Sequence, residues 1–154
     1  MRIHSLVQTL ALSLSIALTA IALSGCGMIA YTARHGFSTP PASEFGMGPR
    51  KSAFGNYVAT LETDAPLRTG KLQTVRLRLR DAAGAAVAGA KVTIDGGMPQ
   101  HGHGLPSRPR VTGESADGVY VVDGLRFNMG GWWELRFVVE RAGLADRIVF
   151  NVRL

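Results

Sequence analysis

The stretch Val75-Arg76-Leu77-Arg78-Leu79-Arg80 decides the fold class, because aliphatic and cationic side chains alternate at every position. Successive side chains of an extended strand point to opposite faces, so this period of two puts the aliphatic groups on one face and the guanidinium groups on the other. The pattern predicts a half-buried antiparallel strand whose arginine face is solvated.

Segments of similar character follow one another along the chain after residue 55. They are rich in Val, Ile, Tyr, Phe and Trp and comprise Tyr57 to Thr63, Ala90 to Asp95, Gly118 to Asp123, Trp132 to Glu140 and Arg147 to Leu154. Turn signals separate them at Asp81 to Gly84, Asp117-Gly118, Asp123-Gly124 and Ala142-Gly143. No segment carries a helical stripe. The sequence therefore predicts an all-β fold, a single small antiparallel β-sandwich over residues 56–154.

The stretch from Asp81 to Val92 resembles the turn and following strand of bacterial immunoglobulin-like modules. The resemblance implies that the predicted sandwich is immunoglobulin-like. It concerns the fold and carries no information on chemistry.

The N-terminus predicts export and lipid attachment. Arg2 supplies a short basic region, Leu6 to Leu23 is a mostly apolar run without charge, and Leu23-Ser24-Gly25-Cys26 resembles the lipobox of bacterial lipoproteins. The resemblance implies a signal peptide over residues 1–25 and lipidation of Cys26, with acyl chains such as palmitate on the first residue of the mature protein. An ordinary signal peptide, or an uncleaved anchor with an incidental cysteine, is the alternative.

Lipidation would consume the only cysteine and leave the mature protein with neither a thiol nor a disulfide. Residues 26–55 are rich in glycine, serine and proline and predict a flexible linker. We therefore expect a domain held in the periplasm of the cell envelope by a membrane anchor, in either the inner or the outer membrane. Removal of Arg2 with the signal peptide would lower the formal net charge from +6 to about +5, which still favours proximity to anionic lipid. No nucleic acid partner is expected, because aromatic residues are not interleaved with the basic ones.

The stretch Met98-Pro99-Gln100-His101-Gly102-His103-Gly104 has the composition of a soft-metal site. Thioether and imidazole suit copper, whereas zinc would want a cysteine or carboxylate, and no Asp or Glu lies between Gly96 and Gly113. The glycines let both imidazoles converge. The alternative is a tight crossing between sheets in which Met98 and Met129 pack as core fillers.

A third or fourth ligand must come from another segment, and the candidate is Met129 in the glycine-rich turn Phe127 to Gly131. Strand alternation then assigns Trp133 to the sandwich interior and Trp132 to the outer face. There Trp132 is expected to shield a bound cuprous ion or to contact a partner. The alternative is that Trp132 only covers the sheet edge.

Several of these pieces occur in an order that resembles the YtkA-like domain and its FixH-like relatives, over roughly residues 56 to 154. The pieces are Met98 to Pro106, Pro109 to Thr112, Asp117 to Tyr120 and Phe127 to Leu135. The resemblance implies an immunoglobulin-like envelope domain concerned with copper handling. It also implies Met98, His101, His103 and Met129 as ligands to Cu(I) or Cu(II), and a copper-accepting oxidase or transporter as partner.

Catalysis is not expected, because no serine or cysteine nucleophile stands in a recognisable frame with a histidine and the carboxylates are scattered. Two hypotheses follow. The first is a membrane-anchored lipoprotein that binds copper for handling or delivery to a copper enzyme. The second is an accessory interaction module that docks onto an envelope complex without any metal.

Overall fold

The computed structural model describes residues 45–154, so the predicted signal peptide, the lipidated Cys26 and the first part of the predicted linker lie outside the described residues. Residues 45–154 form nine strands and no helix. The strands are β1 (Arg50–Lys51), β2 (Tyr57–Glu62), β3 (Leu72–Asp81), β4 (Lys91–Met98), β5 (His103–Gly104), β6 (Arg110–Glu114), β7 (Val119–Arg126), β8 (Trp132–Arg141) and β9 (Leu144–Arg153). Within this part of the chain, no helix long and apolar enough to span a bilayer was found.

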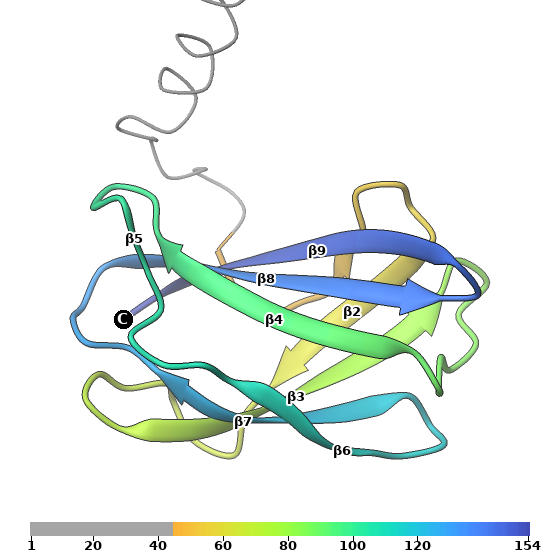
Figure 1. Cartoon of the computed structure of the whole chain (residues 1–154), viewed down its shortest axis with the longest axis horizontal. Helices are drawn as coiled ribbons and strands as arrows, with labels where there is room; N and C mark the ends of the chain where they lie inside the picture. The colour runs from red at the N-terminus through yellow and green to blue at the C-terminus, as the bar shows by residue number, and fades with distance from the viewer. Residues whose placement is uncertain (1–44) are drawn as a thin grey trace, which may run out of the picture. The chain divides into compact units, whose positions relative to one another are not determined.

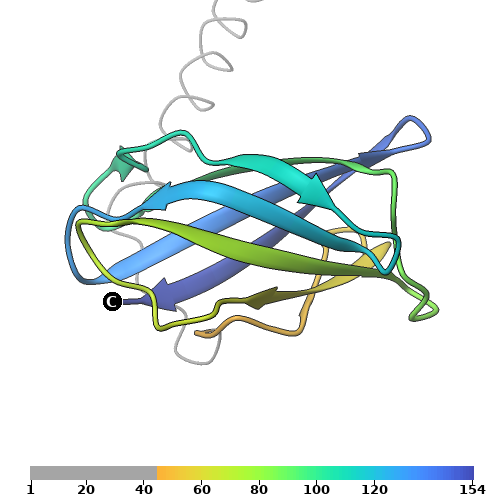
Figure 2. The ribbon, with the colours of Figure 1, turned by 90° about the horizontal axis from the view of Figure 1, so that it is seen from below.

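The strands form two antiparallel sheets packed face to face (Figures 1 and 2). One sheet has the order β1-β2-β3-β7-β6 and the other the order β5-β4-β8-β9. The orders β2-β3-β7-β6 and β4-β8-β9 correspond to the ABED and CFG sheets of the constant-type immunoglobulin sandwich. The predicted all-β, immunoglobulin-like sandwich is confirmed.

The side chains of β3 alternate between buried and outward-facing positions, as the sequence pattern predicted. Val75, Leu77 and Leu79 are fully buried in the core between the sheets, and the arginines between them face outward. On β8, Trp133, Leu135, Phe137 and Val139 join the same core. Both strands therefore obey the parity that the sequence predicted.

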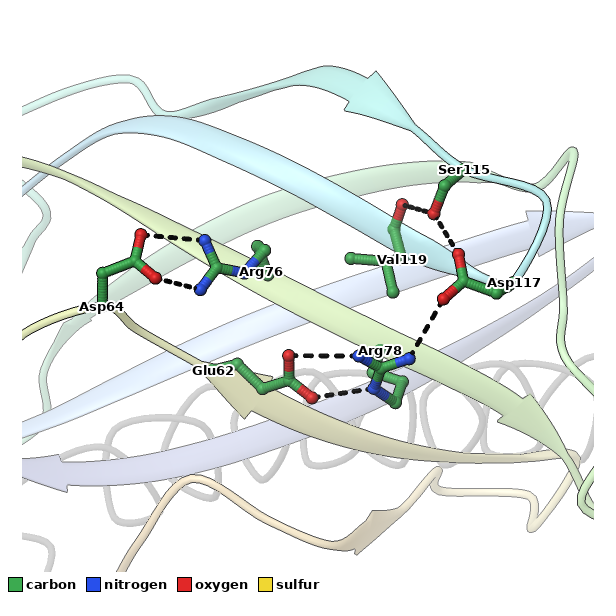
Figure 3. Close-up of polar contacts among 7 residues, drawn as sticks. All are labelled: Glu62, Asp64, Arg76, Arg78, Ser115, Asp117 and Val119. Carbon is green, nitrogen blue, oxygen red and sulfur yellow. Dashed lines mark hydrogen bonds and ion pairs between the residues drawn. The ribbon is translucent and has the colours of Figure 1, made fainter.

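Two of the outward arginines of β3, Arg76 and Arg78, are paired with carboxylates (Figure 3), and the third, Arg80, donates to the Gly84 carbonyl. Arg76 makes two hydrogen bonds to Asp64, and Arg78 lies 2.8 Å from Glu62 and 3.3 Å from Asp117. The hydrogen bond from Arg78 holds the pKa of Glu62 below its usual value. These ion pairs are open to solvent, so this face of β3 is solvated, as the sequence predicted. Exposed ion pairs of this kind contribute little to stability.

One predicted turn is not a turn. Asp123-Gly124 lies inside β7, where the register with β3 shifts between Gln73 and Val75. Gly124 takes a positive φ of 83° at this bulge, and Asp123 accepts hydrogen bonds from Thr74 and Thr112 on the neighbouring strands. A glycine that can adopt positive φ marks bulges as well as hairpin turns, and the sequence alone does not separate the two.

The folded domain begins earlier than residue 56, because residues 45 to 55 pack on the sandwich. Phe45 bridges to Asn151 of β9, and β1 pairs with β2. The Ala53 amide donates to the Arg147 carbonyl at 2.8 Å. Separate contacts with other elements hold this segment in place, so its sequence needs no apolar periodicity. Composition alone therefore does not show that the segment is folded.

Candidate metal site

The stretch from Met98 to Gly104 forms a small hairpin at one end of the sandwich (Figure 1). The His101 and Gly102 amides both donate to the Met98 carbonyl at 3.0 Å, and Gly102 takes a φ of 67° that favours glycine. The chain then returns as β5, where His103 pairs with Met98 and Gly104 with Gly97. The strand β4 thus extends to Met98, three residues beyond its predicted end at Asp95.

This hairpin brings the two predicted imidazoles together. His101 and His103 are both exposed, and their ring centroids lie 5.8 Å apart with the planes tilted by 37°. Metal to imidazole nitrogen distances of about 2.0 to 2.1 Å place the centroids of two rings that share an ion about 6 Å apart at most. Nδ1 of His103 lies 3.3 Å from the Gly104 carbonyl oxygen. When that nitrogen carries the proton, Nε2 presents its lone pair to a metal.

Met98 does not join the imidazoles at the surface. Its side chain is 1% exposed and belongs to the core cluster. Its methyl packs so closely on Gly131 that a Cβ there would lie 2.8 Å from Met98 Cε. The prediction of Met98 as a ligand is therefore not supported by its position, and the packing alternative describes it better. Met98 is the last inward residue of β4 rather than the first residue of a loop.

Met129 lies in the turn between β7 and β8 and keeps 39% of its surface exposed. Its carbonyl accepts a hydrogen bond from Trp133 Nε1 at 3.1 Å. The same indole lies 5.8 Å, centroid to centroid, from the His103 ring. Trp133 therefore contacts both the backbone of the Met129 turn and the histidine hairpin, so Met129 is the predicted thioether ligand whose turn shares a neighbour with the imidazoles.

The two tryptophans lie on the faces that the sequence predicted, but Trp132 does not have the predicted role at the metal site. Trp132 faces outward as expected but is only 4% exposed, because its Nε1 donates to Asn151 Oδ1 at 2.7 Å and Phe45 lies edge-on at 6.4 Å. Trp132 neither shields the histidines nor offers a free contact surface. The prediction was wrong because Phe45, which covers Trp132, was assigned to the linker. The indole that contacts the histidine hairpin is that of Trp133, which also lies in the core as predicted.

A family model described as YtkA-like matches residues 52–138, which is more than half of the chain and contains every candidate ligand of the hairpin and the β7–β8 turn. The chain belongs to the YtkA-like family. This confirms the resemblance drawn from the sequence.

A solved structure, the ZirS C-terminal domain, is 17% identical with a TM-score of 0.40, and the match covers 76% of this chain and 82% of that one. No curated protein matches the chain.

The donors that this YtkA-like domain assembles are few. Residues 45–154 contain no group of three or more His, Cys, Asp or Glu side chains placed to hold a metal ion. The arrangement therefore lacks the carboxylate or thiolate that a protein zinc site would add to two histidines. The donors that the structure brings together are the two imidazoles of His101 and His103.

Proposed function

We propose that this YtkA-like protein is an accessory lipoprotein of the cell envelope that binds copper through His101 and His103. The observation that carries the proposal is the pair of exposed imidazoles with centroids 5.8 Å apart on a hairpin that rests on the core. A YtkA-like domain suggests an envelope accessory domain, and the imidazole pair supplies the finer assignment to copper.

The chemistry of the donors favours binding and transfer. Thioethers bind Cu(I) without losing a proton, and imidazoles bind it in their neutral form. Two histidines and one methionine leave room around the ion for a ligand from a partner, so the ion can pass by ligand exchange to a copper-accepting oxidase or transporter. The buried indole of Trp133 supplies an apolar floor, and such a shell tunes the redox potential of a bound metal.

The same proposal places the protein at a membrane. Cys26 carries the lipid and the domain lies in the periplasm, attached to either the inner or the outer membrane. Several acyl chains make such attachment effectively permanent.

Copper titration of the mature chain tests the proposal. The chain should begin at residue 26 and carry Cys26→Ser, because a free thiol would itself bind copper. We expect one Cu(I) per chain by competition with a chromophoric chelator, and the double variant His101→Ala/His103→Ala should lose it. His35→Ala is the matched control and should bind as the parent does.

Two results would overturn the assignment. Equal binding by the double variant and the parent would remove the site. Absence of binding by the parent would leave the second hypothesis, an interaction module that docks onto an envelope complex without metal.

A further inference from the structure

The described chain enters the domain at the end that carries the histidine hairpin. Phe45 bridges to Asn151, Asn151 pairs with Glu134, and Glu134 pairs with Gly97, which precedes Met98. These four residues form one row across the sheet β5-β4-β8-β9. The row lies beside the hairpin, at the end where β4 and β9 finish and β8 begins (Figure 1).

Phe45 is fixed at that position by several contacts. Its ring lies 6.4 Å from Trp132 in a T-shaped arrangement, and the Arg153 guanidinium lies over the ring at 4.6 Å. The next amide, from Gly46, donates to the Asn151 carbonyl at 2.8 Å. The first described residue of the domain is therefore fixed at the histidine end.

The charge of the domain is polarised along the same axis. The segments at the histidine end, residues 63–71, 99–109, 126–131 and 153–154, contain a single carboxylate side chain, that of Asp64, which is paired with Arg76. They carry five exposed cations, Arg68, Lys71, Arg108, Arg126 and Arg153. Within residues 45–154, none of the five takes part in the ion pairs of the domain. These segments gather at one end of the sandwich in both views (Figures 1 and 2).

The opposite end carries both signs of charge. Its carboxylates are Asp81, Glu114, Asp117, Glu140 and Asp146, and its cations include Lys51, Lys91, Arg141 and Arg147. An anionic lipid surface attracts exposed Lys and Arg within a Debye length, so it favours the histidine end over this one.

Chain length points the same way. The 18 residues between Cys26 and Phe45 span at most about 60 Å when fully extended. Asn151, which pairs with Phe45, lies seven residues from the start of β9, so the opposite end of the sandwich is about 23 Å further away. A lipid on Cys26 would therefore let the histidine end reach the membrane surface, and the charge of that end favours its facing the lipid.

We infer that the domain turns the end carrying His101 and His103 toward an anionic membrane surface. The inference rests on the lipid attachment proposed above. It does not depend on the affinity for copper.

Paramagnetic broadening in lipid nanodiscs tests the orientation. The mature chain from residue 26, labelled with ¹⁵N, is coupled through the Cys26 thiol to a maleimide lipid in discs that contain a gadolinium-chelating lipid. The discs are made of phosphatidylcholine with or without phosphatidylglycerol. We expect the amides of residues 100–104 and 127–131 to broaden severalfold more than those of residues 53–56 and 142–145. Phosphatidylglycerol should increase the difference, and salt should reduce it.

Two triple variants with equal change of charge provide the control. Arg68→Gln/Lys71→Gln/Arg126→Gln should remove the increase due to phosphatidylglycerol, and Lys51→Gln/Arg141→Gln/Arg147→Gln, at the opposite end, should keep it. All six side chains are exposed, so both variants should fold. Equal broadening at both ends, stronger broadening at residues 142–145, or equal effects of the two triples would overturn the inference. Copper titration of the same discs reports separately on the metal site.

Discussion

The imidazole of His103 lies in a T-shaped arrangement with the indole of Trp133, with ring centroids 5.8 Å apart. Trp133 is fully buried, and Phe127 packs on it at 5.2 Å from the other side of the core. Its Nε1 also donates to the Met129 carbonyl. One core side chain therefore supports both turns of the candidate site, which ties the geometry of exposed ligands to the packing of the sandwich.

Trp133→Phe should weaken copper binding although it removes no ligand. The shorter ring loses the hydrogen bond to Met129 and draws back from His103, so we expect a Cu(I) affinity lower by roughly tenfold, about 1.4 kcal/mol. Competition titration measures it. Trp132→Phe is the control, because it loses a comparable hydrogen bond to Asn151 on the outer face and should retain the parent affinity. Equal losses in the two variants would show that only general stability is involved.

Substitutions of Met98 and Met129 should have different effects, because Met98 packs in the core and Met129 is the proposed ligand. Met98→Ala opens the core and should lower the free energy of unfolding by about 2 to 5 kcal/mol, with the copper affinity of the folded protein unchanged. Met129→Leu should change stability by no more than about 0.5 kcal/mol, since the side chain is partly exposed, and should lower the Cu(I) affinity. Urea unfolding and Cu(I) competition on both variants measure the four quantities. The assignment fails if Met98→Ala alone lowers the affinity.

Gly97→Ala should disturb the histidine hairpin from within β4. A Cβ at Gly97 would lie 2.5 Å from the His103 carbonyl oxygen, so β5 must move away and carry His103 with it. We expect lower copper affinity with both imidazoles still present. Gly113→Ala on β6 is the matched control, because its Cβ would meet Val121 at an ordinary 3.6 Å. Undisturbed binding in Gly97→Ala would mean that the pairing of β5 is not needed.

The sequence predicted the elements whose side chains alternate. Val75 to Arg80 predicted β3 and its buried face, and the parity of β8 was assigned correctly for both tryptophans. It did not predict features that depend on a distant partner. Phe45 covers Trp132, but it lies in a segment without apolar periodicity. Met98 is a core residue because β4 continues as far as Met98, which the sequence did not predict. The imidazole pair was predictable because its two members are separated by a single glycine.

Contacts between residues 52–56 and Asp146 should make the stability of the domain depend on pH. Asp146 of β9 is 3% exposed, and its carboxylate accepts hydrogen bonds from the Phe54 amide at 3.1 Å and from Asn56 Nδ2 at 3.0 Å. Burial raises the pKa of Asp146, but hydrogen bonds from Ser52, Phe54, Arg147 and Asn56 outweigh it and hold the pKa below the usual value. A carboxyl whose pKa is lower in the folded than in the unfolded state stabilises the fold above the unfolded pKa. That stabilisation is lost as the pH falls through the folded value.

Asp146→Asn should therefore lower the free energy of unfolding at neutral pH by about 1 to 3 kcal/mol, because the amide replaces an ionised acceptor with a weaker one. The difference from the parent should shrink as the pH falls below about 4, where the unfolded carboxyl of the parent becomes protonated. Urea unfolding between neutral and acidic pH measures this difference. Asp95→Asn, on an exposed ion pair with Arg136, should change stability little at neutral pH. A difference that stays constant with pH would show that Asp146 acts through its shape alone, and the ionised carboxylate would then have no part in holding residues 52–56 on β9.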